Sequence, residues 1–212
     1  PGSSFKPFVY SAAFERGFTP ASIVNDAPLV FADPSREDGL WKPSNDDDEF
    51  LGPMRLREAM VQSRNLVSVR VLDAIGVRYA REYIARFGFT PEALPENLSL
   101  ALGTSSVPPL AMARGYSVFA NGGYLVDPWF VSRIEDDRGN VAYRADPVRA
   151  CARCAERLSE SGGSTATAQD LGAMLGNVAP APAATATTAA DPTALPAGAV
   201  RLAPRVIDAR NA

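Results

Sequence analysis

The stretch that decides the fold is Ser3-Ser4-Phe5-Lys6-Pro7-Phe8, near the start of the printed sequence. Apolar residues at positions 5, 8, 9, 12 and 13 follow the spacing of an amphipathic helix, and Gly17 is typical of a helix end. Pro7 is tolerated in a first turn, because the N–H groups there have no intrahelical partner. We therefore predict a helix that begins beside Ser3 and carries Lys6 one turn later on the same face.

Ser3 and Lys6 in this spacing can form a reactive pair. A serine hydroxyl is a weak nucleophile that needs a base beside it. A lysine held against the core loses its preference for the charged form and can act as that base, and the N-terminus of a helix favours a developing oxyanion. Taken alone, however, a Ser-x-x-Lys more often marks an N-cap serine and a surface lysine, so the rest of the chain must decide.

The composition limits the chemistry that is available. The 212 residues are 46% hydrophobic and 21% charged with a net charge of −3, which suits a globular domain and gives no reason to expect nucleic-acid binding. The sequence contains no histidine, which excludes a Ser-His-Asp or Cys-His site and any histidine-ligated metal. Lysine occurs only as Lys6 and Lys42, and Lys42 lies in a predicted polar turn. We expect no cofactor and no bilayer-spanning run in these residues.

The apolar spacing predicts a helical subdomain with tight joints. One helix is expected after Gly52, with Pro53 in its first position, and two more helices are closed by Gly76 and Gly88. The other predicted elements are a short strand at 29–31, a surface loop at 33–49, a helix ending at 121–123, and strands at 129–135 and 141–144 around a turn.

Ser63-Arg64-Asn65 is the polar joint between the first two of those three helices. Serine and asparagine are common capping residues, so a purely structural role is one interpretation. The other places a second hydroxyl and a side-chain amide at the mouth of a cleft. There the hydroxyl could relay a proton, and the amide could hold a substrate carbonyl and orient the lysine.

Three further stretches carry alternatives. The acidic run at 46–49 is expected to be a solvated turn, although a metal site is the sharper interpretation. Cys151 and Cys154 could form a tight disulfide, a redox pair or two free thiols. Residues 151–203 are a low-complexity segment that we expect to be a flexible insertion, and 204–212 are expected to begin another helix.

Several stretches, taken together and in this order, resemble the transpeptidase domain of class A penicillin-binding proteins of the 1A type. The resemblance extends over roughly residues 1–150 and the last nine. The matching stretches are Pro1-Gly2-Ser3-Ser4-Phe5-Lys6-Pro7-Phe8, Phe18-Thr19-Pro20-Ala21-Ser22, Asn25-Asp26-Ala27-Pro28, Leu56-Arg57-Glu58-Ala59, Ser63-Arg64-Asn65, Leu102-Gly103, Met112-Ala113-Arg114-Gly115-Tyr116 and Phe119-Ala120-Asn121-Gly122-Gly123.

The resemblance implies a catalytic role for four residues. Ser3 would be the acylated nucleophile and Lys6 its base, Ser63 would pass the proton to the leaving group, and Asn65 would bind the substrate amide and position Lys6. The implied reaction is D,D-transpeptidation of D-Ala-D-Ala stem peptides of peptidoglycan. β-Lactams would acylate Ser3 in the same way, and the implied location is the periplasmic side of the bacterial cytoplasmic membrane.

The implied fold is the α+β fold of serine β-lactamases and transpeptidases, with a helical subdomain beside an antiparallel sheet. Residues 1–150 would form an incomplete part of this domain. The family's third motif, Lys-Thr-Gly or Lys-Ser-Gly on an edge strand, is absent from the sequence. We therefore expect a fragment cut at both ends, whose membrane anchor would belong to a missing N-terminal segment.

Two alternative functions remain on sequence grounds, a β-lactam hydrolase and a non-catalytic penicillin-sensing or penicillin-binding module of the same fold. The middle residue of the second motif is Arg64 rather than the aspartate usual in β-lactamases. A Glu-x-x-Leu-Asn segment, of the kind that drives deacylation in those enzymes, is also absent. Both observations favour the transferase over the β-lactam hydrolase.

A polypeptide of residues 1–212 alone is expected to react with penicillin slowly or not at all. In the family, the missing strand supplies one of two oxyanion donors, and the loss of one such donor costs a factor of about 10²–10³ in rate. Labelling with a fluorescent penicillin, followed by intact-mass measurement, checks this expectation. Rapid stoichiometric labelling would contradict it.

Overall fold

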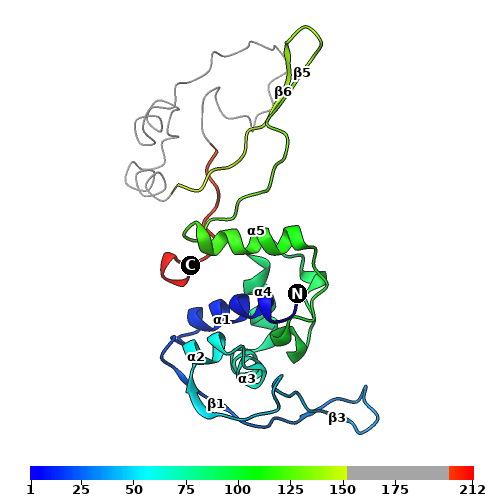
Figure 1. Ribbon diagram of the computed structural model, residues 1–212, viewed down its shortest axis with the longest axis vertical. Coiled ribbons are helices and arrows are strands. Elements are labelled where there is room, and N and C mark those ends of the chain that lie inside the picture. Colours follow the sequence, from blue (N-terminus) through cyan, green and yellow to red (C-terminus); the bar gives the residue numbers. More distant parts are fainter. Residues whose placement is uncertain (152–200) are drawn as a thin grey trace. The chain divides into compact units, whose positions relative to one another are not determined.

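The computed structural model describes residues 1–151 and 201–212, and two compact units can be distinguished in it (Figure 1). One comprises residues 1–123 with 206–212, and the other residues 124–205. In the first unit the helices are α1 (Lys6–Glu15), α2 (Leu56–Val61), α3 (Asn65–Ile75), α4 (Val77–Ala85) and α5 (Pro109–Ala120), with 3-10 turns at Gly2–Phe5, Pro91–Ala93, Leu98–Leu102 and Ala209–Asn211.

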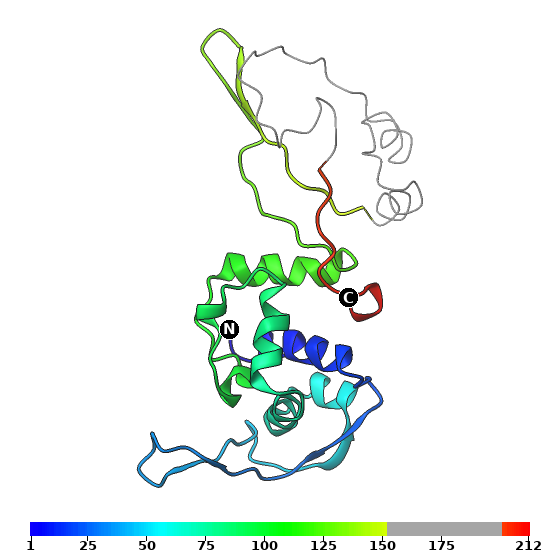
Figure 2. The ribbon, with the colours of Figure 1, turned by 180° about the vertical axis from the view of Figure 1, so that it is seen from behind.

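Helix α1 is the centre of the first unit. Figures 1 and 2 show it between α5 on one side and α2 with α3 on the other, and it also packs against α4. Residues 8–13 are all buried, so the prediction of an amphipathic helix is wrong: α1 is surrounded, and its small residues Ser11, Ala12 and Ala13 allow neighbours to approach. The predicted start beside Ser3 and end near Gly17 agree with the structure.

An aromatic cluster fixes the first turn of α1. Phe8 is fully buried, and its ring lies 5.0–5.4 Å, centroid to centroid, from five other rings. Such tilted and edge-to-face contacts add to the free energy of burial. These rings belong to Phe5, Phe87, Phe89, Tyr116 and Phe119, and so join α1 to α5 and to the segment after α4.

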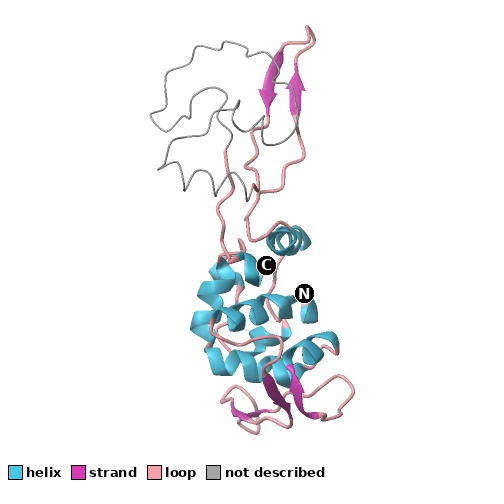
Figure 3. Ribbon diagram, turned by 90° about the vertical axis from the view of Figure 1, so that its left-hand side faces the viewer, coloured by secondary structure: helices cyan, strands magenta, loops and turns pink. Residues whose placement is uncertain are grey.

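The strands of the first unit lie at one end of the helical body (Figure 3). Strand β1 (Ile23–Asp26) pairs antiparallel with β4 (Gly52–Arg55), so the predicted helix start at Pro53 is wrong. In a two-stranded sheet both strands are edges, and an edge strand tolerates a residue without an N–H. Helix α2 begins three residues later than predicted, at Leu56.

The remaining strands form two short hairpins. Strand β2 (Phe31–Ala32) begins at the last residue of the predicted strand at 29–31 and pairs with β3 (Leu40–Trp41), which lies within the expected surface loop at 33–49. In the second unit, β5 (Arg133–Glu135) pairs with β6 (Val141–Arg144) around the predicted turn. Strand β5 is shorter than the 129–135 expected, and β6 has the predicted bounds.

The segment expected to begin a new helix at 204–212 forms a single 3-10 turn, Ala209–Asn211. The amide of Asn211 holds this turn against α1 and α4: its Nδ2 donates to the backbone oxygen of Ser11 and to the Tyr83 hydroxyl, both at 2.9 Å. Cys151 is disulfide-bonded, the first of the three alternatives considered. Cys154 and most of the predicted insertion at 151–203 lie outside the described residues.

None of the helices in the described part of the chain combines the length and the apolar character needed to cross a bilayer.

Substitution of Gly103 is expected to disturb the turn that carries Ser3. The N–H of Gly2 donates to the Gly103 oxygen at 3.1 Å, and a Cβ at position 103 would lie 2.0 Å from the Gly2 oxygen. Gly103→Ala should therefore lower the free energy of unfolding by more than the roughly 1–2 kcal/mol that a left-handed backbone costs an alanine.

The matched control for that variant is Gly39→Ala. Gly39 has a similar φ, +66° against +69° for Gly103, but open space around its Cβ position. Urea unfolding of both variants measures the difference. An equal loss of stability in the two would show that the close approach to Gly2 carries no energetic weight.

Candidate active site

Ser3 lies in the 3-10 turn Gly2–Phe5, immediately before α1, and its side chain is exposed to a pocket. The turn is held from two sides. The N–H of Gly2 is bonded to Gly103, and the Tyr116 hydroxyl on α5 donates to the Ser4 oxygen at 2.7 Å. Ser3 therefore sits on a fixed backbone while its hydroxyl remains accessible. The residues that line the pocket with it are Asn45, Asp46, Asp47, Gln62, Ser63, Arg64 and Asn65.

Lys6 is buried one turn after Ser3, with 1% of its surface exposed. Its Nζ donates to the Ser63 backbone oxygen at 2.5 Å, to the Ser63 Oγ at 3.0 Å and to the Asn65 Oδ1 at 2.7 Å. Three of the four residues singled out in the sequence thus contact one another, and the fourth, Ser3, lines the same pocket as Ser63 and Asn65. In the described part of the chain, no hydrogen bond joins Lys6 Nζ to the Ser3 hydroxyl.

Burial makes the Lys6 amine easier to deprotonate. Loss of solvation is the largest effect and lowers its pKa from 10.5 to about 8, with the nearby Asp46 carboxylate acting to raise it and the Arg64 guanidinium acting to lower it. The neutral amine is therefore populated near pH 8, and a neutral amine has the lone pair that a general base needs.

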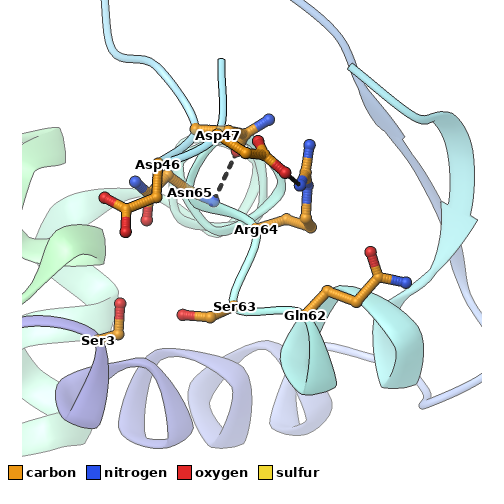
Figure 4. Close-up of a pocket in the computed structure, with 8 residues that line it drawn as sticks. Ser3, Asp46, Asp47, Gln62, Ser63, Arg64 and Asn65 are labelled. Atoms are coloured by element: carbon orange, nitrogen blue, oxygen red, sulfur yellow. Dashed lines mark hydrogen bonds and ion pairs between the residues drawn. The ribbon is translucent and has the colours of Figure 1, made fainter. Parts of the chain in front are cut away.

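The joint between α2 and α3 directs Ser63 into the pocket. Ser63 has φ of +55°, a left-handed conformation that is uncommon for residues other than glycine. The adjacent N–H of Arg64 donates to the Ala59 oxygen at 2.9 Å and closes the end of α2. Figure 4 shows the Ser63 hydroxyl pointing across the pocket toward Ser3, while the Arg64 side chain leaves on the other side of the joint.

The amide of Asn65 is oriented by two contacts. Its Nδ2 donates to the Ser44 oxygen at 3.0 Å, which turns Oδ1 toward Lys6. Neither Ser63 nor Asn65 caps α3 with its side chain. The cap comes from Asn45, whose Oδ1 accepts the N–H groups of Asn65 and Leu66 at 2.9 and 3.2 Å. The capping interpretation of the joint is therefore wrong for both residues.

Two residues of the acidic run at 46–49, Asp46 and Asp47, line the pocket. Asp47 pairs with Arg64 at 2.6 Å, and this contact lowers the pKa of the Asp47 carboxyl. Among the residues that the structure describes, no three His, Cys, Asp or Glu side chains are arranged to hold a metal ion. All four residues of the run, Asp47 included, are exposed to solvent, in agreement with the expected solvated turn.

Sequence reasoning missed three polar residues behind the pocket. Asp26, Asn45 and the side chain of Arg64 are buried and bonded to one another. The sequence signal was weak. Asp26 appeared only within a stretch that resembles the family, Arg64 was used only to distinguish the second motif from that of β-lactamases, and Asn45 lay in an expected surface loop. Burial of an Asp and an Arg is rare without pairing, but burial itself could not be inferred from local periodicity.

Comparison with known proteins gives a consistent result. A family model described as "Penicillin binding protein transpeptidase domain" matches residues 1–198. Penicillin-binding protein 1A of Pseudomonas aeruginosa is 56% identical over 149 residues, and that of Escherichia coli is 49% identical over 153. These matches cover 70% and 72% of this chain and 18% of each relative, so the chain spans less than a fifth of the length of either.

Solved structures agree with the sequence matches. The crystal structure of penicillin-binding protein 1A from Haemophilus influenzae has a TM-score of 0.68 at 40% identity, over 72% of this chain and 23% of that one. PonA1 of Mycobacterium tuberculosis in complex with penicillin V has a TM-score of 0.57 at 26% identity, over 68% and 40%. The described elements therefore have the serine β-lactamase and transpeptidase fold that the resemblance implied.

The titration of Lys6 can be observed directly, because the chain has only one other lysine. With ¹³C-labelled lysine, the Lys6 Cε resonance is expected to titrate with a midpoint near pH 8, and Lys42→Arg assigns the signals. Asp46→Asn should move the midpoint downward, because it removes a negative charge that favours the ammonium form. Asp38→Asn, at an exposed pair with Lys42, is the control. A midpoint above pH 10 would contradict the burial argument.

Proposed function

Because the chain belongs to the family of penicillin-binding protein transpeptidase domains, we propose that it acts in a peptidoglycan D,D-transpeptidase with Ser3 as the acylated nucleophile. The observation that carries the proposal is the contact of the buried Lys6 Nζ with Ser63 Oγ and Asn65 Oδ1, beside the pocket that Ser3 lines. A lysine general base, a hydroxyl and an amide around one serine are the groups that acyl transfer without histidine requires.

Lys6 can serve as the base because of how its hydrogen bonds are distributed. An ammonium group has three N–H donors, and three acceptors surround Nζ. A neutral amine has two N–H donors and one lone pair. The two donors satisfy the oxygens of the Ser63 backbone and the Asn65 amide, which leaves the lone pair for a hydroxyl proton. The site therefore accommodates both protonation states, as a proton carrier must.

The proposed acylation moves one proton in a circuit. Ser3 Oγ attacks the carbonyl carbon of the penultimate D-Ala, and its proton passes to Lys6. The C–N bond then breaks, the proton travels from Lys6 through the Ser63 hydroxyl to the departing D-Ala amine, and an ester on Ser3 remains. The contact at 3.0 Å between Lys6 Nζ and Ser63 Oγ is the route for that transfer.

The proposed second half reverses these steps. An amine of a second stem peptide attacks the ester carbonyl, its proton passes through the Ser63 hydroxyl to Lys6, and Ser3 Oγ leaves and regains the proton. A β-lactam would enter the same circuit, because attack by Ser3 Oγ on its ring carbonyl breaks the ring C–N bond and leaves an ester of the same kind. The solved structure of PonA1 in complex with penicillin V supports this part of the proposal.

The substrates and location follow from the same proposal. Peptidoglycan stem peptides are the acyl donors and acceptors, and the reaction takes place on the periplasmic side of the bacterial cytoplasmic membrane. The family model that matches residues 1–198, a penicillin-binding protein transpeptidase domain, supports a transpeptidase over the hydrolase and the sensing module. The sequence-based division into residues 1–150, 151–203 and 204–212 also remains a proposal.

The test of the nucleophile is penicillin labelling of the full chain as its gene encodes it. We expect a fluorescent penicillin to add one acyl group, located on the Ser3 peptide by mass spectrometry, and Ser3→Ala to abolish the adduct. Lys6→Ala should slow labelling by about 10²–10⁴-fold, the usual contribution of a general base. Ser4→Ala is the matched control, since its exposed hydroxyl donates to the Pro1 oxygen and takes no part in the contacts of Lys6, Ser63 and Asn65.

Two results would overturn the proposed function. Stoichiometric labelling that persists in Ser3→Ala would assign the nucleophile elsewhere. Loss of the adduct within minutes as hydrolysed penicillin would make the chain a hydrolase. With a D-Ala-D-Ala pentapeptide and a D-amino acid acceptor, exchange of the terminal D-Ala would instead support the transferase.

A further inference from the structure

A buried polar network adjoins the pocket and consists of Asp26, Asn45 and Arg64, which are 0%, 2% and 5% exposed; Asn45 and Arg64 also line the pocket. We propose that these three residues are positioning residues for acyl transfer: they hold the joint between α2 and α3 in the arrangement that brings Ser63 and Asn65 to Lys6. The inference rests on the proposed function for its kinetic consequence, but the holding of the joint can be tested without it.

Asn45 is the member that touches the joint. Its Oδ1 accepts the N–H groups of Asn65 and Leu66, the first two of α3, which have no acceptor within the helix. Its Nδ2 donates to Asp26 Oδ1 at 2.8 Å and to the Glu49 oxygen at 2.9 Å. Only an amide both accepts and donates in this manner, so the direction in which Asn45 points is fixed by its partners.

Asp26 fixes that direction. It ends strand β1 and is completely buried, and its carboxylate accepts from Asn45 Nδ2, from the Leu51 N–H at 3.1 Å and from Arg64 Nε at 2.8 Å. A carboxylate has no donor, so Asn45 must present its NH₂ group to it. The oxygen of Asn45 is then left to face α3.

Arg64 anchors the joint from the side away from Ser3 (Figure 4). Besides Asp26, its guanidinium donates to Asp47 Oδ2 and to the Glu49 oxygen, both at 2.6 Å. Arg64 stands between Ser63 and Asn65 in the sequence, so these bonds restrain both neighbours. The left-handed backbone of Ser63 needs such restraint, because sparsely populated conformations persist only where the surroundings determine them.

The network is better explained by positioning than by stability. A buried ion pair often stabilises a fold no more than apolar residues of the same volume would, because both charges lose their hydration. What it supplies is a single geometry. Here that geometry sets the Ser63 oxygens and the Asn65 Oδ1 at 2.5–3.0 Å from Lys6 Nζ, and errors of about 1 Å at such contacts can cost 10²-fold in rate.

The test exchanges the two polar partners. Each single variant breaks the donor–acceptor match. Asp26→Asn places two amides opposite each other, and Asn45→Asp places two carboxylates opposite each other. The double variant, Asp26→Asn with Asn45→Asp, restores an amide opposite a carboxylate and keeps the total charge. The Glu49 oxygen, which accepts from Asn45 Nδ2, then faces a carboxylate, so the recovery is expected to be partial. Asp38→Asn is the matched control, since it removes one carboxylate from an exposed pair in the same stretch.

The first readout is saturable penicillin labelling of the full chain as its gene encodes it. Each single variant should lower the first-order acylation constant about 10- to 100-fold, with the concentration for half-saturation within about twofold of the parent. The double variant should label faster than either single variant without reaching the parent, because the Glu49 oxygen stays without its donor, and Asp38→Asn should match the parent. If a single variant does not fold, Asp47→Asn replaces it, because it weakens the anchoring of Arg64 without leaving a buried charge unpaired.

The second readout is amide hydrogen exchange at Asn65 and Leu66, which needs no activity. Exchange at both amides should accelerate at least tenfold in Asn45→Asp or Asp47→Asn relative to amides in the middle of α4, and return in the double variant. If the parent chain is never acylated at Ser3, the proposed function fails while this readout still tests the holding of the joint.

Three outcomes would overturn the inference. One is a folded single variant with unchanged acylation and exchange. Another is a loss of labelling that is explained by the fraction of unfolded protein alone. Ile84→Val, which shortens a buried side chain in α4, would then lose as much labelling as a network variant of the same stability. The last is a folded double variant that recovers neither readout.

Discussion

The structure depends on the insertion of one lysine amine into a turn that lies almost sixty residues further along the chain. Lys6 Nζ has three oxygen partners, all supplied by Ser63 and Asn65. To bring them together, α1 must be buried on nearly all sides and α3 must start exactly one residue after an anchored arginine. The aromatic cluster around Phe8 and the β1–β4 pair meet these two requirements from opposite ends of the helical body.

Holding an amine in this way has a thermodynamic cost that depends on pH. The pKa of Lys6 is lower in the folded chain than its ordinary value, so the unfolded chain binds more protons between pH 8 and 10.5. The free energy of unfolding therefore rises with pH across that window as Lys6 loses its proton. Below pH 8, the full free-energy cost of burying the charged amine remains. The fold accepts this cost at neutral pH, and in exchange Lys6 has an accessible neutral form.

The sequence was sufficient for the local features and insufficient for those that join distant residues. Closure of α3 at Gly76 and the turn before β6 depend on neighbours in the chain, and both were predicted. For Ser63, the residues alone allowed two interpretations, and the family resemblance favoured the one that places it at the site. Strand β4 was missed because Pro53 is a common helix start and only pairing with β1 makes it a strand. Asn45 was missed because its four partners are scattered over residues 26–66.

The stretch before β4 has two parts that should tolerate changes in length differently, because only the second contains Asn45 and its neighbours. Around the tip of the β2–β3 hairpin, residues 34–38 are exposed, and their side-chain bonds go to hairpin neighbours such as Asp33 and Lys42. Insertions and deletions there should therefore leave the pocket intact. Between Ser44 and Glu49, main-chain oxygens bond to the Asn65 and Arg64 side chains. A change in length there would pull those acceptors out of register, so lineages should vary the hairpin freely while conserving the spacing that follows it.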